Sequence, residues 1–114
     1  MITPEQVENR LLELSKEVDE AHKDLSEAEM NYHKAKIAFE MNMAKMRLSI
    51  GQSNHKLRVA QIDDEALWRN AEHWEAIQIA EALVKASRSN ANRVRTQVDI
   101  ARSVGTSVRA SMEL

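Results

Sequence analysis

Apolar residues recur at alternating steps of four and three along the first half of this chain. Two interleaved sets carry the pattern, namely Leu11, Val18, Leu25, Tyr32, Phe39 and Met46, and Val7, Leu14, Ala21, Ala28 and Ala35. An average spacing of 3.5 residues keeps these side chains on one stripe of an α-helix, which we call the seam, facing a partner helix. The pattern predicts a coiled-coil helix over about residues 4–50. Thr3 and Gln6 are expected to form a capping box around Pro4 at its start.

A second stripe with the same alternation occupies the C-terminal half of the chain. It consists of Ile77, Ala80, Val84, Ser87, Ala91, Val94, Val98, Ala101, Gly105, Val108 and Met112. This stripe predicts a second long helix over about residues 64–111. Gly51 is expected to end the first helix, and residues 51–63 are expected to form a turn and connector. Within the connector, residues 56–62 fit either a short helix or an extended crossing.

The composition favours an all-α fold and an assembled state. Only 2 Gly and 1 Pro occur in 114 residues, so few turns are expected, and 4% aromatic residues disfavour a compact globular core. We therefore predict one helical domain over residues 1–114, a long helical hairpin or coiled coil that assembles into a helical oligomer. The residues expected at the oligomer seam are Leu11, Leu14, Val18, Leu25, Tyr32, Phe39, Val94, Val98 and Val108.

Charge is segregated along the chain, although the formal net charge is only −2. Residues 1–40 carry ten acidic and five basic side chains, whereas residues 41–62 carry four basic and no acidic ones. Residues 82–112 carry six basic side chains and a single acid, Asp99. Such segregation indicates charged partners or contacts between oppositely charged arms.

Several kinds of site and location are not expected. The absence of Cys excludes disulfides and thiolate metal sites, which fits a cytoplasmic protein. No run approaches a membrane span of about 18 residues, and the acidic, polar start is not a signal peptide. Asp19 and His22 have an acid-x-x-His spacing, but no second such pair completes a di-metal site. No phosphate-binding Gly-rich loop or nucleophile motif is present, so we expect no enzyme activity, no cofactor and no metal.

The basic segment around the predicted turn is the candidate binding site. Lys45 and Arg47 precede the turn, and Lys56 and Arg58 follow it, so a hairpin places all four near one end. Such a cluster attracts phosphate backbones through counterion release, although a solvated helix end is the simpler interpretation of the same charges. Trp68 and Trp74 could stack on bases, but packing against a neighbouring helix is the more common role for such tryptophans.

The stretch Ala44-Lys45-Met46-Arg47-Leu48-Ser49-Ile50-Gly51 resembles the Lys-x-Arg-Leu segment of phage UvsY-type recombination mediators. The segment from residue 94 to 112, with Arg102-Ser103-Val104-Gly105, resembles the Arg- and Gly-containing C-terminal part of that family. Ser49-Ile50 stands where the family has an aromatic pair. The resemblance covers about eight positions at residue level and the helical layout over most of the chain.

The resemblance implies a homo-oligomer that binds single-stranded DNA and, as in that family, a ring of helical hairpins. It also implies a recombinase and a single-strand-binding protein as partners, in a phage-infected bacterial cytoplasm. Carried over to this chain, it assigns phosphate contacts to Lys45 and Arg47, while Lys56 and Arg58 are added from their position alone. The alternative is a coiled-coil structural or adaptor protein that binds only protein. In that case the basic C-terminal helix would dock on the acidic N-terminal arm of a neighbour.

Overall fold

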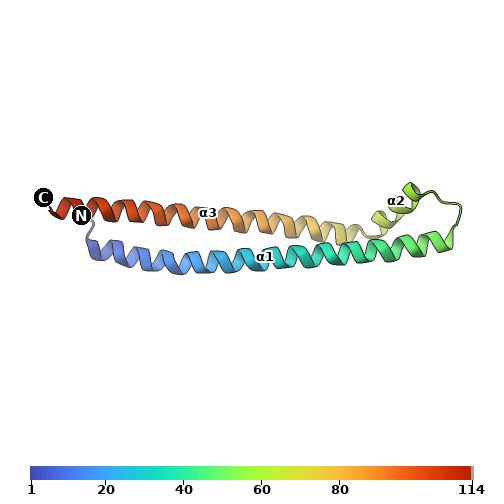
Figure 1. Cartoon of the computed structure of the whole chain (residues 1–114), viewed down its shortest axis with the longest axis horizontal. Coiled ribbons are helices and arrows are strands. Elements are labelled where there is room, and N and C mark those ends of the chain that lie inside the picture. The colour runs from blue at the N-terminus through green and yellow to red at the C-terminus, as the bar shows by residue number, and fades with distance from the viewer. Residues whose placement is uncertain (114) are drawn as a thin grey trace. The chain divides into compact units, whose positions relative to one another are not determined.

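A computed structural model describes residues 1–113 as three α-helices, with no strand in that range (Figure 1). Helix α1 spans Pro4–Ser53, α2 spans Val59–Arg69 and α3 spans Ala71–Glu113. The described residues divide into two compact units. Unit 1 holds residues 1–27 and 85–113, and unit 2 holds residues 28–84. Within each unit α1 runs antiparallel to α3, so the prediction of an all-α helical hairpin is confirmed.

Helix α1 begins with the predicted capping box. The Thr3 backbone N–H donates to Gln6 Oε1 at 2.9 Å, and the Gln6 N–H donates to Thr3 Oγ1 at 3.2 Å. Pro4 occupies the first helical position, where a missing N–H costs no helical hydrogen bond. The start of α1 could therefore be predicted to the residue.

The end of α1 lies two residues beyond Gly51, which was expected to terminate the helix. No residue among 1–113 has a positive φ, so Gly51 has helical backbone and does not form a left-handed cap. Ser53 ends the helix and donates its Oγ–H to the Ser49 carbonyl at 2.9 Å. A Cβ built on Gly51 would meet the Ile62 Cδ1 atom at 3.8 Å, an ordinary van der Waals contact.

Gly51→Ala is expected to stabilise the protein by about 0.5–1 kcal/mol, because alanine favours the helical backbone that Gly51 adopts. Chemical denaturation followed by circular dichroism at a fixed protein concentration measures the change. A loss of stability would contradict the helical conformation of this residue, because alanine is penalised at a left-handed cap.

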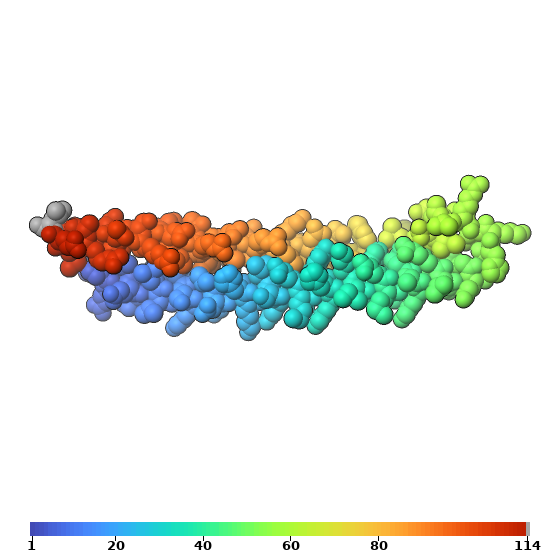
Figure 2. Space-filling view, viewed as in Figure 1, coloured from blue at the N-terminus to red at the C-terminus, as the bar shows by residue number. Residues whose placement is uncertain are grey.

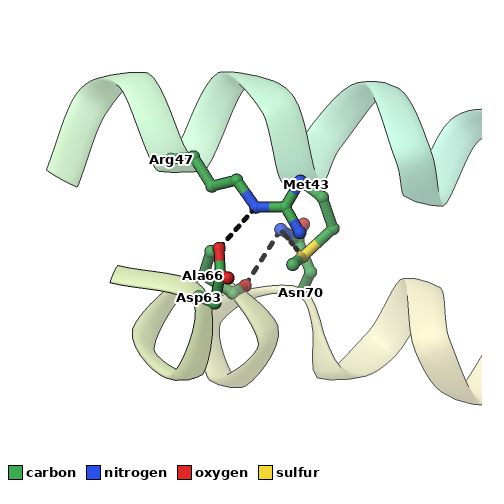
Figure 3. A network of polar contacts seen from close by, with 5 residues as sticks. All are labelled: Met43, Arg47, Asp63, Ala66 and Asn70. Atoms are coloured by element: carbon green, nitrogen blue, oxygen red, sulfur yellow. Dashed lines mark hydrogen bonds and ion pairs between the residues drawn. The ribbon is translucent and has the colours of Figure 1, made fainter. Parts of the chain in front are cut away.

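The predicted second helix is interrupted by a break at Asn70. The short helix α2 begins at Val59, which resolves the ambiguity over residues 56–62 in favour of a helix preceded by a turn. Asn70 is 2% exposed and has φ −103° and ψ 20°, which offsets α2 from α3. Its Nδ2 donates to the Ala66 carbonyl at 3.0 Å and lies 3.6 Å from Met43 Sδ (Figure 3). The Asn70 backbone N–H also donates to the Ala66 carbonyl at 3.0 Å, and hydrophobic periodicity does not reveal this break.

The seam and the C-terminal stripe form the interior of both units. The buried members are Val7, Leu14, Ala21, Ala28, Ile77, Ala80, Val84, Val94 and Gly105. Leu14 and Val94 are the largest fully buried side chains, so the seam has a partner within its own chain. The other residues expected at an oligomer seam are half-buried: Leu11, Val18, Leu25, Tyr32, Phe39, Val98 and Val108. Their use between copies stays a prediction, as does the single domain over residues 1–114.

The two helices of unit 1 approach each other closely at Gly105. A Cβ at this position would lie 2.9 Å from the Val7 Cγ1 atom, too near for an unstrained contact. Glycine is therefore required here by space, since its φ is not positive.

Gly105→Ala is expected to destabilise the protein by about 1 kcal/mol, because overpacking against Val7 outweighs the gain in helix propensity. In a Val7→Ala background the same change is expected to stabilise by about 1 kcal/mol, because the space is then open. A double-mutant cycle from urea denaturation measures the coupling. Equal effects of Gly105→Ala in the two backgrounds would contradict the close approach.

Unit 2 exposes large apolar side chains of α1. Met30, Ile37, Met41 and Leu48 are each more than half exposed. A surface of this kind favours association with further helices.

Candidate nucleic-acid interface

The four predicted cations lie at the connector end of unit 2, which we call the tip. Lys45 and Arg47 belong to the last turns of α1, Lys56 lies in the connector, and Arg58 directly precedes α2. All four residues are exposed. The space-filling view shows side chains of the connector region, coloured green, projecting from the surface (Figure 2). The topology therefore places all four residues at one end of unit 2, although they lie up to thirteen positions apart in the sequence.

Backbone and side-chain hydrogen bonds hold the connector in place. The Lys56 N–H donates to Asn54 Oδ1 at 3.1 Å, and the Leu57 N–H donates to the Asn54 carbonyl at 3.4 Å. The Arg58 N–H donates to Gln61 Oε1 at 3.0 Å, which anchors the start of α2. These bonds fix the backbone and leave the Lys56 and Arg58 side chains exposed to solvent.

A small apolar cluster positions α2 against the end of α1. Met43, Ile50 and Ala66 are buried, and partly buried hydrophobic residues pack against them: Phe39, Met46, Leu57 and Ile62. Ala66 is 0% exposed, so α2 approaches α1 closely at this residue. Met43 and Met46 thus serve as packing residues, as their flexible side chains favour.

Arg47 forms an ion pair within the chain that the sequence did not predict. Its Nε lies 2.8 Å from Asp63 Oδ1 of α2 (Figure 3). Arg69 pairs similarly with Glu65 at 3.0 Å. The segment 41–62 is free of acids in sequence, but the fold places α2 and its acidic residues beside it. The tip is consequently less basic than the sequence segment indicated.

Lys45 and Arg47 also point in different directions. Residues two apart on an α-helix are separated by about 200° around its axis. Arg47 faces α2, as its ion pair shows, so Lys45 lies on the far side of α1 from that contact. The two side chains therefore do not form one continuous phosphate-binding surface. This divergence could have been deduced from helical spacing alone.

The two tryptophans of unit 2 are exposed to solvent. Trp68 of α2 is 79% exposed and Trp74 of α3 is 48% exposed. The chain thus covers about half of Trp74 and little of Trp68, and packing of these rings against the helix of a neighbour stays a prediction. An exposed indole beside cations is a platform on which nucleic-acid bases stack. Asp64 and Glu65 lie one helical turn before Trp68, so acidic side chains are also present near this exposed ring.

A polar pair crosses the interior of unit 2 close to the tip. Asn42 Nδ2 and His73 Nε2 lie 2.8 Å apart, and this contact is partly buried. Asn42 interrupts the apolar seam, and the structure supplies it with a partner thirty-one residues away. Such a pair fixes the register of two helices, since a sliding helix would leave both groups unpaired.

Residues 1–113 contain neither a metal-ligand cluster nor a membrane-spanning helix. No group of three His, Asp or Glu side chains in this range could hold a metal ion. No helix in the same range is long and apolar enough to cross a membrane. Asp19 and His22 line an open groove of unit 1 together with Arg95, Asp99 and Arg102.

Comparison with known proteins found no matching family model, no similar curated protein and no similar solved structure.

Proposed function

We propose that this chain is an oligomeric, single-stranded-DNA-binding recombination mediator. The observation that carries the proposal is the state of the tip cations. Lys45, Lys56 and Arg58 are exposed and make no ion pair among residues 1–113. Unpaired cations gain the most from phosphate contact, because no internal partner must be displaced. Arg47, which pairs with Asp63, is a weaker candidate than the sequence indicated.

The proposed mechanism is multivalent. One protomer offers three cations and the exposed ring of Trp68, which is too little for tight binding alone. An oligomer repeats this set, and binding of a second tip to the same strand becomes intramolecular. Stacking on an aromatic ring depends little on base identity, so binding is expected to be sequence-tolerant. A strand held in this way would be presented to a recombinase in place of the single-strand-binding protein, within a phage-infected bacterial cytoplasm.

Fluorescence anisotropy of a labelled single-stranded oligonucleotide, titrated at two salt concentrations, tests DNA binding. The proposal expects binding that weakens steeply as salt rises, because cation–phosphate contacts release counterions. Quenching of the tryptophan fluorescence on DNA addition is expected as well. No binding at low salt would refute the proposal.

A coiled-coil adaptor that binds only protein is the second candidate function. The exposed apolar residues Met30, Ile37, Met41 and Leu48 favour it, because they recur at steps of seven, four and seven along one face of α1. This candidate expects an oligomer, or a complex with another helix, that does not bind oligonucleotide at low salt. The same titration therefore separates the two functions.

A further inference from the structure

Four arginines of α3 form a row with seven-residue spacing: Arg88, Arg95, Arg102 and Arg109. Seven residues make nearly two helical turns, so successive members lie on one face about 10.5 Å apart. We call Arg95, Arg102 and Arg109, all in unit 1, the arginine ladder. The Arg109 Nε–H donates to the Gly105 carbonyl at 3.3 Å, and neither Arg95 nor Arg102 forms an ion pair within residues 1–113.

The arginine ladder lines an open groove between α1 and α3 in unit 1. Arg95 and Arg102 border a space of about 420 Å³ with an apolar floor that includes Leu11, Val18 and Val98. Arg102 and Arg109 border its neighbour of about 140 Å³, beside Glu8. Asp19 and Asp99 also line the larger space, so the groove has both signs of charge. A mixed surface over an apolar floor suits a protein helix better than a uniformly negative strand of nucleic acid.

The N-terminal part of α1 carries a matching acidic row. Its members are Glu13, Glu17, Glu20, Asp24 and Glu27, which alternate in steps of four and three. We call this row the acidic stripe. All of its members are exposed except the half-buried Glu17. Glu13, Glu20 and Glu27 repeat every seven residues and span the same axial distance as the three ladder arginines, about 21 Å.

The acidic stripe and the arginine ladder lie on opposite faces of unit 1. From α1, the ladder groove is lined by Ser15 and His22, which do not belong to the stripe. Arg10, three residues before Glu13 on the line of the stripe, borders a different groove with Gln97 and Ile100 of α3. A single copy cannot bring the two rows together, because its own helices separate them.

We propose that the arginine ladder of one copy docks on the acidic stripe of a second copy. The groove is then occupied by helix α1 of the second copy, whose acidic residues have the same seven-residue spacing as the arginines. This contact would also cover the apolar floor of the groove. Because each copy carries the two rows on opposite faces, the contact is heterologous. Such contacts continue from copy to copy until a ring closes or a filament grows. This inference rests on the assembly part of the proposed function and is independent of DNA binding.

Charge reversal on one face at a time tests the proposal by light scattering. Arg95→Glu with Arg102→Glu, and separately Glu20→Arg with Glu27→Arg, are each expected to reduce the mass from a multiple of 13.0 kDa to the monomer. An equimolar mixture of the two variants is expected to assemble again well above the monomer mass, because each junction between two different variants joins opposite charges. Circular dichroism verifies that each variant keeps its helical content. If charge reversal unfolds the chain, the neutral variant Arg95→Gln with Arg102→Gln replaces it in the same mass measurement, with the same expected loss of assembly.

Arg93→Glu is the matched control, because Arg93 is exposed on α3 but lies about 200° around the helix from Arg95. Its mass is expected to equal that of the wild type.

Folded reversal variants that keep the wild-type mass would overturn the docking of the two rows while assembly itself stands. A mixture of the two variants that stays monomeric would overturn it as well. A monomeric wild-type protein would overturn the assembly part of the proposed function as well. Loss of DNA binding by the Arg95→Glu, Arg102→Glu variant at an unchanged mass would likewise overturn the docking, because it would assign the arginine ladder to contact with nucleic acid.

Discussion

Leu14→Ala is expected to lower the free energy of unfolding by about 2–5 kcal/mol, the cost of a large-to-small change at a fully buried leucine. Leu14 is 1% exposed and is, with Val94, the largest fully buried side chain. The interior of unit 1 is a single line of side chains between two helices, so few neighbours can move in to fill the cavity. A loss of this size is a large part of the stability of an ordinary domain.

Leu12→Ala is the matched control for this prediction. Leu12 belongs to the same helix and is 65% exposed, so its truncation is expected to change stability by no more than about 0.5 kcal/mol. Urea denaturation followed by circular dichroism, at one protein concentration, measures both variants. Similar losses for the two leucines would contradict the burial of the seam within the chain, and a larger loss at Leu12 would indicate that the outer face of α1 is the main interface.

Replacement of Lys45, Lys56 and Arg58 by alanine is expected to weaken single-stranded DNA binding about tenfold or more at low salt. It is also expected to flatten the slope of log affinity against log salt by about 2 for each engaged protomer, since each phosphate contact contributes about 0.7 on single strands. The physical reason is the loss of three exposed cations that have no ion-pair partner among residues 1–113. Anisotropy titrations over a series of salt concentrations measure both quantities.

A triple variant with alanine at Lys23, Lys34 and Lys36 removes the same number of charges from exposed positions of α1 away from the tip. It is expected to leave the salt slope unchanged, whereas a purely global effect of net charge would change the two variants equally. An unchanged slope in the tip variant would assign DNA binding to another surface.

The sequence predicted the helices well because one physical signal dominates them. Apolar spacing of 3.5 residues identified both stripes, and the members from Ile77 to Val108 are buried or half-buried in the structure. Apolar periodicity indicates which face of a helix is buried. It does not indicate whether a helix of the same chain or a helix of another copy covers that face. The seam was therefore assigned to contacts between copies, while the structure shows that Leu14 and Val94 are already buried within one chain.

The connector and the site were harder to predict, because they depend on contacts between distant residues. The helix breaks at Asn70, whose side chain donates to the Ala66 carbonyl, and the pair between Arg47 and Asp63 forms across sixteen residues. Neither leaves a periodic signal. The acidic residues that follow the basic segment, Asp63, Asp64 and Glu65, were visible in the sequence. Their position beside the end of α1 depends on the packing of α2, which the sequence did not predict. The seven-residue arginine row was also visible in the sequence, but its meaning depends on the groove beside it.

Size-exclusion chromatography with light scattering, applied to the wild-type protein alone and mixed with a single-stranded oligonucleotide, tests the central claim most directly. An oligomer that binds DNA is expected to elute alone at a multiple of 13.0 kDa and to carry the oligonucleotide with it at low salt. A protein that elutes at 13.0 kDa and leaves the oligonucleotide unbound would contradict the claim.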